Sequence, residues 1–221
     1  MSWSGQDGGP RRRGYHHGNL REALIEAALD LIAQKGPAGF TIAEAARAAG
    51  VSPAAPYRHF RDADALLADV ALRGFERFEA ALAAAWNKGK PDPIRAFEAL
   101  GRAYLGFARN EPAYYAAMFE THIPLEAHPG LLAAGDRAFA IFREAAETVS
   151  ATVPKGSRPP SLMVALHMWA LAHGIASLFA RPDPARRKLP MPPEDLLEAG
   201  ILLYLQSVGL AGGPLAGGEP R

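Results

Sequence analysis

Hydrogen-bond donors that suit phosphate oxygens gather between residues 41 and 59 of the chain. Thr41 offers a hydroxyl, Tyr57 a phenol and His59 a ring nitrogen, and each can donate to a phosphate oxygen. Thr41 also precedes a predicted helix, whose exposed backbone N–H groups attract an anion. Donors placed this closely in the sequence indicate contact with the backbone of a nucleic acid.

Small side chains separate these donors. Residues 52–55 read Ser-Pro-Ala-Ala, and side chains of this size let a backbone enter a DNA major groove, which is about 12 Å wide. The outer face of this stretch carries no Asn, Gln or Lys for bidentate base recognition, so we expect thymine methyl contacts and Arg58 to supply specificity. A basic run at residues 11–13 adds three arginines to the candidate DNA-binding residues. The candidate DNA-binding residues are Arg11, Arg12, Arg13, Thr41, Ser52, Pro53, Ala54, Ala55, Tyr57, Arg58 and His59.

The charge of the chain is unevenly distributed. The net charge is only +1, but residues 1–61 carry eight Arg or Lys and five Asp or Glu, a balance of +3. The remainder, residues 62–221, has a balance of −2. A basic head on a mildly acidic body favours nucleic acid as the partner of the N-terminal end.

Composition excludes several classes. Apolar residues make up 49% of the 221 residues, which excludes disorder as the overall state. The absence of cysteine excludes disulfides and thiolate metal sites and agrees with a cytoplasmic location. Residues 1–13 lack the apolar core of a signal peptide. The most apolar stretch, residues 162–180, contains His167 and His173 and is interpreted as a buried or interface helix rather than a membrane span.

Signatures of catalysis are missing from the sequence. We find no glycine-rich phosphate loop, no nucleophile elbow and no arrangement of acid–base residues. His16 and His17 are adjacent and point apart, and His122 and His128 have no carboxylates at ligand spacing. No enzymatic activity, metal or cofactor is therefore expected.

The elements that must position these residues are helices. Strand alternation is nearly absent, and Ala- and Leu-rich runs are interrupted by Pro and Gly. The predicted fold is all-α with about nine helices, at residues 20–35, 42–49, 53–60, 63–86, 93–109, 112–120, 131–152, 162–180 and 194–208.

Capping residues mark a helix-turn-helix in the head. Thr41 caps the second helix, with Glu44 completing a capping box, and Gly50 makes the turn. Ser52 caps the third helix with Pro53 at its first position, where a missing N–H costs nothing. Three short helices with a tight glycine turn between the second and third describe a helix-turn-helix.

Several spaced elements in residues 14–70 agree with one family pattern. They are Gly14-Tyr15-His16-His17-Gly18-Asn19-Leu20-Arg21, Phe40-Thr41-Ile42-Ala43-Glu44-Ala45-Ala46, Gly50-Val51-Ser52, Tyr57-Arg58-His59-Phe60 and Leu66-Leu67. Together they resemble the DNA-binding domain of the tetracycline-repressor (TetR) family. Trp169, His173 and Gly174 are similar to the Trp…His-Gly signature of one C-terminal subgroup. Ala63 stands where the family often has a phosphate-binding Lys, and the arm at residues 11–13 is expected to compensate.

The resemblance implies a homodimer and a ligand pocket in the helical body. It divides the chain into a flexible basic arm (1–14), a helix-turn-helix domain (15–62), an effector-binding and dimerisation domain (63–208) and a disordered tail (209–221). Helices 162–180 and 194–208 would pair with those of a second copy into a four-helix bundle. The candidate interface residues are Leu166, Gly174, Ile175, Leu178, Leu196, Gly200, Leu203 and Tyr204.

Aromatic residues of the body supply candidates for effector binding. A sensor pocket is apolar with a few polar groups. Large residues at helical spacing more often form an ordinary core, and the spacing of Trp169 and His173 favours a core pair over a ligand contact. The candidate ligand-binding residues are Phe78, Tyr104, Met118, Phe119, His122, Phe142, Trp169 and His173.

The predicted function is transcriptional regulation. We expect a repressor that leaves a palindromic double-stranded DNA operator when a small apolar or aromatic effector binds, with no membrane partner. Helix 63–86 runs from head to body, so its tilt is expected to couple the two. The alternative is a helical enzyme or scaffolding protein with an incidental helix-turn-helix. The sequence leaves the ligand, the operator and the choice between repression and activation open.

Overall fold

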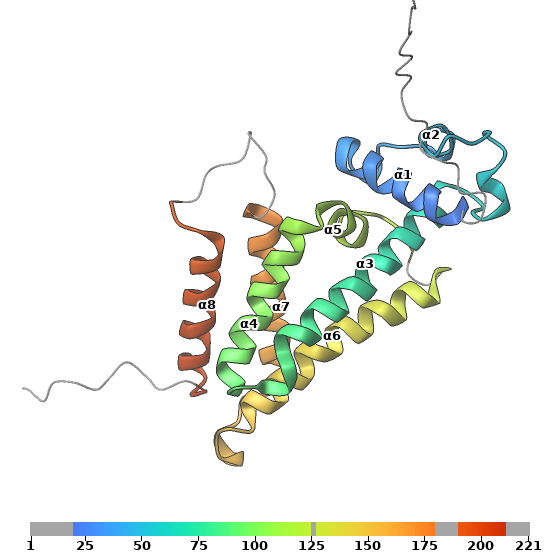
Figure 1. The fold of residues 1–221 in the computed structure, drawn as a ribbon. Coiled ribbons are helices and arrows are strands. Elements are labelled where there is room, and N and C mark those ends of the chain that lie inside the picture. Colours follow the sequence, from blue (N-terminus) through green and yellow to red (C-terminus); the bar gives the residue numbers. More distant parts are fainter. Residues whose placement is uncertain (1–19, 125–126, 180–189, 211–221) are drawn as a thin grey trace, which may run out of the picture.

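The computed structural model describes residues 20–124, 127–179 and 190–210. The described residues form eight α-helices and no β-strand (Figure 1). The predicted arm at residues 11–13 and the predicted cap Asn19 lie outside the described residues. The all-α prediction is confirmed, with one fewer α-helix than expected.

Two short helices build the head. The buried side of α1 (Leu20–Lys35) consists of Leu24, Ile25, Ala27, Ala28, Leu31 and Ile32. In α2 (Ile42–Ala48) the predicted capping box forms: the Thr41 hydroxyl accepts from the Glu44 N–H, and the Glu44 carboxylate accepts from the Thr41 N–H. A hydrogen bond from Lys35, with those from Thr41, lowers the pKa of Glu44 to about 2. The carboxylate therefore ties the end of α1 to the start of α2.

The predicted α-helix at residues 53–60 is wrong. This stretch is a turn followed by one 3-10 turn, η1 (Pro56–Arg58). Pro56 has no N–H to donate to the carbonyl of Ser52, so the first α-helical hydrogen bond cannot form. The Ala55 N–H donates to Ser52 O at 3.0 Å instead, one residue closer in sequence. The motif thus presents a compact turn where we expected a helix.

One long helix leaves the head and enters the body. α3 (Ala63–Trp86) has the predicted bounds, because the Asp62 carboxylate caps its start at the Ala65 N–H and Asn87 ends it in a left-handed conformation. The turn η2 (Asn87–Gly89) leads to α4 (Pro93–Asn110), and α5 (Pro112–Phe119) follows at once. Figure 1 shows α3 crossing the molecule diagonally, with the head at one end.

Three more helices complete the body. α6 (Pro129–Ser150) packs along α3, α7 (Ser161–Phe179) packs against α4 and α6 after the turn η4 (Lys155–Ser157), and α8 (Pro193–Ser207) covers α4 and α7. α8 lies on the side of the body away from the head (Figure 1). The predicted tail begins too early, because Gly209 closes the helix at positive φ and Leu210 is buried, its N–H bonded to Leu205 O.

Candidate DNA interface and ligand cleft

The predicted DNA-contacting residues lie on the outer surface of the head. Thr41, Ser52, Pro53, Ala54, Arg58 and His59 are exposed, Ala55 is partly buried, and Tyr57 is 59% exposed. Pro56 and Phe60 point the other way, into the core, and fix the turn to it. Arg58 makes no ion pair with any described residue. The surface therefore offers small side chains beside three donors without a partner among the described residues, Tyr57, Arg58 and His59, whereas the Thr41 hydroxyl already donates to Glu44 Oε2 at 3.1 Å.

Four charged side chains fasten the head to α3; we call them the junction network: Arg21, Glu22, Asp69 and Arg73. The Arg21 guanidinium donates to both oxygens of Asp69, at 2.5 and 3.2 Å, and Arg73 binds both oxygens of Glu22. Asp69 is only 9% exposed, so its charge depends on these partners. The hydrogen bond from Arg73 lowers the pKa of Glu22. α1 and the first half of α3 are thereby held in one orientation.

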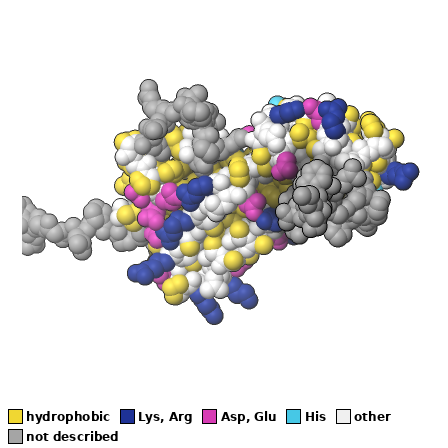
Figure 2. Space-filling view, turned by 45° about the horizontal axis from the view of Figure 1, so that its top comes forward, with side chains coloured by type: hydrophobic (Ala, Val, Ile, Leu, Met, Phe, Trp, Pro, Cys, Tyr) yellow, Lys and Arg dark blue, Asp and Glu magenta, His cyan; other side chains and the backbone are white. Residues whose placement is uncertain are grey.

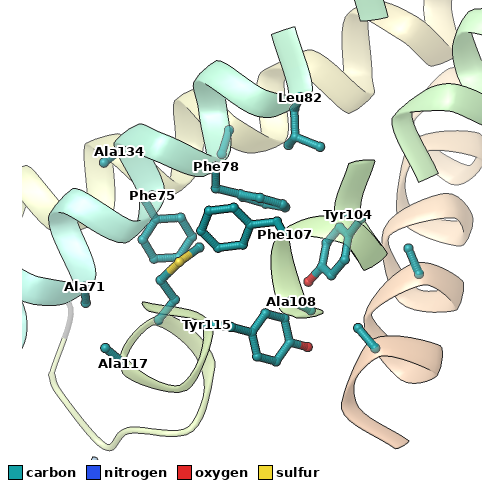
Figure 3. Close-up of a cluster of buried hydrophobic side chains, with 14 of the residues drawn as sticks. Ala71, Phe75, Phe78, Leu82, Tyr104, Phe107, Ala108, Tyr115, Ala117 and Ala134 are labelled. Atoms are coloured by element: carbon teal, nitrogen blue, oxygen red, sulfur yellow. The ribbon is translucent and has the colours of Figure 1, made fainter. Parts of the chain in front are cut away.

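A cluster of rings fills the body, and we call it the aromatic cluster. Its members are Phe78, Tyr104, Phe107, Tyr115, Phe119, Phe142 and Trp169. Phe78 lies at its centre, with ring centroids 5.0 Å from both Tyr104 and Phe107. Figure 3 shows four of these rings, Phe78, Tyr104, Phe107 and Tyr115, entering from α3, α4 and α5. Edge-to-face contacts of this kind stabilise a core beyond the area that they bury.

Two phenols of the cluster share one histidine nitrogen. The hydroxyls of Tyr104 and Tyr115 lie 2.8 and 3.1 Å from His173 Nδ1, and in Figure 3 both point toward the same side. A neutral ring with its proton on Nε2 offers the single lone pair of Nδ1 as the acceptor for these phenols, and Tyr104 and Tyr115 also hydrogen-bond to each other. Burial lowers the pKa of His173, against the opposing charge of Glu120, and burial raises the pKa of Tyr104. The neutral forms therefore hold this network together.

A cleft of about 310 Å³ opens beside the aromatic cluster, between α3, α6 and α7. Its lining residues are Phe75, Leu131, Leu132, Gly135, Asp136, Phe139, Leu166 and Trp169. Only Trp169 belongs to the predicted ligand-binding set, and Leu166 had been assigned to the dimer interface. Phe78, Tyr104 and Phe142 have no exposed surface and lie beneath the cleft. These three stay predictions as ligand contacts, because other rings cover them in this structure; Phe75 rather than Phe78 lines the cleft.

Other predicted ligand-binding residues lie elsewhere. Met118 is buried against Gly74 of α3. His122 is exposed and lines a second, more polar cavity of about 270 Å³ between the head and the segment after α5. His122 is therefore not brought to the aromatic cluster, whereas Phe119 and His173 are.

Six exposed apolar side chains outside the cleft mark what we call the α7–α8 face: Leu162, Met163, Leu178, Met191, Leu202 and Leu203. Leu203 is 67% exposed, and a Cβ at Gly174 would meet no atom of the chain within 4 Å. Ile175 is only 4% exposed and belongs to the core, so its assignment to a dimer interface is corrected. Gly200 faces Leu171 of α7 within the same chain.

One further contact characterises this side of the molecule. The rings of His167 and Tyr204 stack at 3.6 Å and join α7 to α8. Figure 2 shows hydrophobic side chains beside neighbouring acidic and basic ones on the body. Among the described helices, α7 is long and apolar enough to cross a membrane by length and composition alone. In the fold it packs against α4, α6 and α8.

Comparison with known proteins assigns both the head and the body of the chain to a family. Residues 24–70 match the family model of bacterial regulatory proteins of the tetR family, and residues 97–204 match the model of a tetracyclin repressor-like C-terminal domain. The chain belongs to the TetR family. It is a transcriptional regulator of the DNA-binding class, and members of the family dimerise and bind small-molecule effectors.

Individual relatives agree with the TetR assignment. A protein of unknown function from Rhodococcus sp. RHA1 is 31% identical, with 89% of this chain and 98% of that one covered and a TM-score of 0.72. The regulator PfmR from Thermus thermophilus, 23% identical, shares the fold over 82% of this chain and 96% of its own, with a TM-score of 0.63. The HTH-type regulator YobS of Bacillus subtilis (strain 168) is 29% identical over 106 residues. That match spans about half of each protein, 48% of this chain and 54% of YobS.

Sequence reasoning missed several residues that shape this TetR-family site. Asp69 and Arg73 lie on α3 four residues apart, a spacing that could have suggested a shared face, but nothing in the sequence names α1 as their partner. Tyr115 was visible as an aromatic residue of the body, without a sign that its hydroxyl meets His173. Phe75 and Phe139 are, in the sequence, ordinary apolar positions of their helices. Their role as cleft walls depends on how three helices pack.

Proposed function

We propose that this regulator is a repressor that binds a palindromic operator as a homodimer and releases it when a small apolar ligand occupies the cleft. One observation carries the proposal: α3 is a continuous helix whose first half is fastened to the head and whose Phe75 lines the cleft. A ligand that moves Phe75 would therefore tilt the element on which the head is mounted.

The head would dock through its compact turn. Ser52, Pro53 and Ala54 present small exposed side chains, so the backbone of the turn can come close to base edges. Tyr57 and His59 flank it and would bind phosphates, which fix the register without reading sequence. Arg58 reaches outward from the same turn and would supply direct base recognition. Thr41 adds a hydroxyl and the N-terminus of α2 for one more phosphate.

The α7–α8 face would form the dimer contact. Exposed apolar side chains of this extent on one side of a soluble domain indicate a protein interface, and a C2 dimer buries the same face on both copies. Gly174 leaves room for a second backbone. The two heads would then meet successive major grooves, about 34–36 Å apart. The Trp169…His173-Gly174 subgroup signature is part of this proposal, since Trp169 lines the cleft and Gly174 lies on the same helix.

Release needs a ligand that prefers the conformation unable to bind DNA. A ligand shifts such an equilibrium only by its difference in affinity for the two states, and couplings of about 1–3 kcal/mol are usual. The cleft is open to solvent on one side and rests on the aromatic cluster on the other. Occupancy would thus press on α3 from the α6–α7 side.

DNA binding is tested by sequencing the DNA that the purified protein retains from its own genome, followed by titration of that operator and of random DNA. Tyr57→Phe should weaken both DNAs by a similar factor, because a lost phosphate contact carries no sequence information. Tyr114→Phe on α5 removes a phenol outside the head and should change neither affinity. Failure to retain any specific DNA would overturn the repressor assignment in favour of an enzyme or scaffold.

Dimerisation is tested with two matched glycine variants. Gly174→Leu and Gly106→Leu each place a side chain where the chain itself has open space, on α7 and on α4 respectively. Only Gly174→Leu should overfill a dimer contact, at a cost of about 1–3 kcal/mol, and shift sedimentation toward monomer. Equal dimerisation of both variants would remove Gly174 from the interface.

A further inference from the structure

The wall of the cleft is apolar apart from one carboxylate. Phe75, Phe139 and Trp169 contribute rings from three different helices, and the Phe139 and Trp169 rings meet edge to face at 5.1 Å. Aromatic faces carry partial negative charge and attract cations. No Lys or Arg lines the cleft among the described residues. The walls therefore accept an apolar body and tolerate a positive charge better than a negative one.

Asp136 is the one charged residue of the lining. It is exposed and forms no ion pair or hydrogen bond with any described residue. The adjacent basic residue, Arg137, is already bound to Glu79 of α3, with Arg137 Nε 2.9 Å from Glu79 Oε2. The Asp136 carboxylate is thus left without a cation at the edge of an aromatic-walled cleft. A ligand cation would supply that missing partner.

We propose that the cleft selects lipophilic cations, that is, small apolar molecules that carry a single positively charged group. This inference rests on the proposed function, because it names the ligand class of the same cleft. The apolar body would lie against Phe75 and Trp169, and the cationic group would lie between Asp136 and an aromatic face. An anionic amphiphile of the same size would place its charge beside an unpaired carboxylate and is disfavoured.

The size of the cleft limits the ligand. Its volume of about 310 Å³ is at the lower end of the range for small-molecule sites. At roughly 30 Å³ for each non-hydrogen atom, the share of a water molecule in the liquid, it holds about ten such atoms. An eight-carbon chain with one polar group fits this limit. Three such molecules share the eight-carbon length and carry a positive, a neutral and a negative head group: octylammonium, 1-octanol and octanoate.

Isothermal titration calorimetry of the full-length protein with these three probes tests the selection. We expect octylammonium to bind at least tenfold more tightly than 1-octanol, and octanoate to bind most weakly. Asp136→Asn should bring octylammonium to within about threefold of 1-octanol and leave the alcohol unchanged. Asp30→Asn, which removes an exposed carboxylate from α1, should keep the full selectivity. Thermal melts of both variants check that the fold is intact.

Four results would contradict the proposed ligand class. Equal binding of the three probes, a preference for octanoate, no binding of any probe, or unchanged selectivity in Asp136→Asn would each overturn the proposal. An operator titration run in parallel separates this from the proposed function. If specific DNA is bound while no probe enters the cleft, the ligand class fails and the regulator stands. If no specific DNA is bound, the proposed repressor fails whatever the calorimetry shows.

Discussion

The two halves of α3 contact their neighbours through different kinds of side chain. In the first half, Asp69 and Arg73 bind α1 through paired charges, and Asp69 is buried while its partner Arg21 is 52% exposed. In the second half, Phe78, Leu82 and Trp86 are buried among the helices of the body. Phe75 stands at the boundary, at the wall of the cleft. Leu66 and Val70 of the first half are buried as well, so what distinguishes that half is the buried charged network that it adds to its apolar contacts.

The charged contacts mainly fix the orientation of α1 on α3, whereas the apolar contacts mainly supply stability. Charged pairs at a partly exposed surface contribute little free energy of unfolding, about 0–1 kcal/mol each, but their hydrogen bonds are directional and fix how α1 lies on α3. Apolar packing has no such direction and supplies most of the stability. We expect damage at the head end to disturb DNA binding and damage at the body end to disturb folding.

Removal of the Phe78 ring should give the largest loss of stability. Phe78 has no exposed surface and contacts rings from three other helices, so Phe78→Ala leaves a cavity that the packed cluster cannot fill. The expected loss in the free energy of unfolding is about 3–5 kcal/mol. Urea titration followed by circular dichroism measures it. Phe139→Ala, at the partly exposed cleft wall, should cost clearly less; equal losses would contradict the placement of Phe78 at the centre.

The sequence predicted the body helices closely because their end signals are strong. α3 has the predicted bounds, since Asp62 supplies a capping carboxylate and the Asn87-Lys88-Gly89 segment permits a left-handed exit. The helix at residues 53–60 failed for a local reason that was also in the sequence: Pro56 lies at the fourth position after the cap Ser52, where a helix needs its first N–H donor. The capping pattern at Ser52 and Pro53 predicted a helix in spite of Pro56.

The site was less predictable than the fold. Phe75 and Phe78 are three residues apart and share a face of α3, yet one lines the cleft and the other is covered. The distinction depends on where α6 and α7 cross α3, which the sequence of α3 does not contain. The Asp69–Arg21 contact is hidden for a related reason: charged residues on a helix usually face water, and this pair forms only because α1 lies across α3.

Loss of the Asp69 charge tests the other half of the comparison. Asp69→Asn removes one charge from the junction network and leaves Arg21 without its carboxylate. Because Arg21 and Arg73 reach solvent, the loss in stability should be about 1–2 kcal/mol, less than for a fully buried pair. Operator affinity should fall by a larger factor than stability alone explains, since α1 loses its fixed orientation.

The matched control for this variant is Glu76→Gln, an exposed carboxylate on the same helix that pairs with no described residue. It should change stability by less than about 0.5 kcal/mol and leave operator affinity intact. Urea titrations and operator titrations of both variants give the comparison. If Asp69→Asn weakens folding and DNA binding only in proportion, the junction network serves stability rather than orientation.

Lower pH should weaken the contacts of the two halves of α3 in separate pH ranges. These losses of stability should be the smallest of the predicted effects. Burial lowers the pKa of His173 below the ordinary value of 6.5, so the unfolded chain takes up a proton more readily. The contribution of this group to stability is complete above pH 6.5 and is lost as the pH falls through its folded-state pKa. Arg73 holds the pKa of Glu22 below 4.5, so the junction network keeps its contribution down to pH 4.5 and loses it as the pH falls further.

Unfolding titrations between pH 7.5 and 4.5 should therefore show a decline that originates at the aromatic end. His173→Gln keeps a polar group facing Tyr104 and Tyr115 but cannot titrate, and it should flatten this decline. His167, whose pKa is also lowered by burial at the α7–α8 contact, contributes to the same range, and His167→Gln measures its share. Glu22→Gln should leave the slope between pH 6.5 and 4.5 unchanged and flatten only the fall at lower pH. A His173→Gln protein with the wild-type slope would show that the two phenols do not depend on a neutral His173, and acid would then no longer distinguish the two halves of α3.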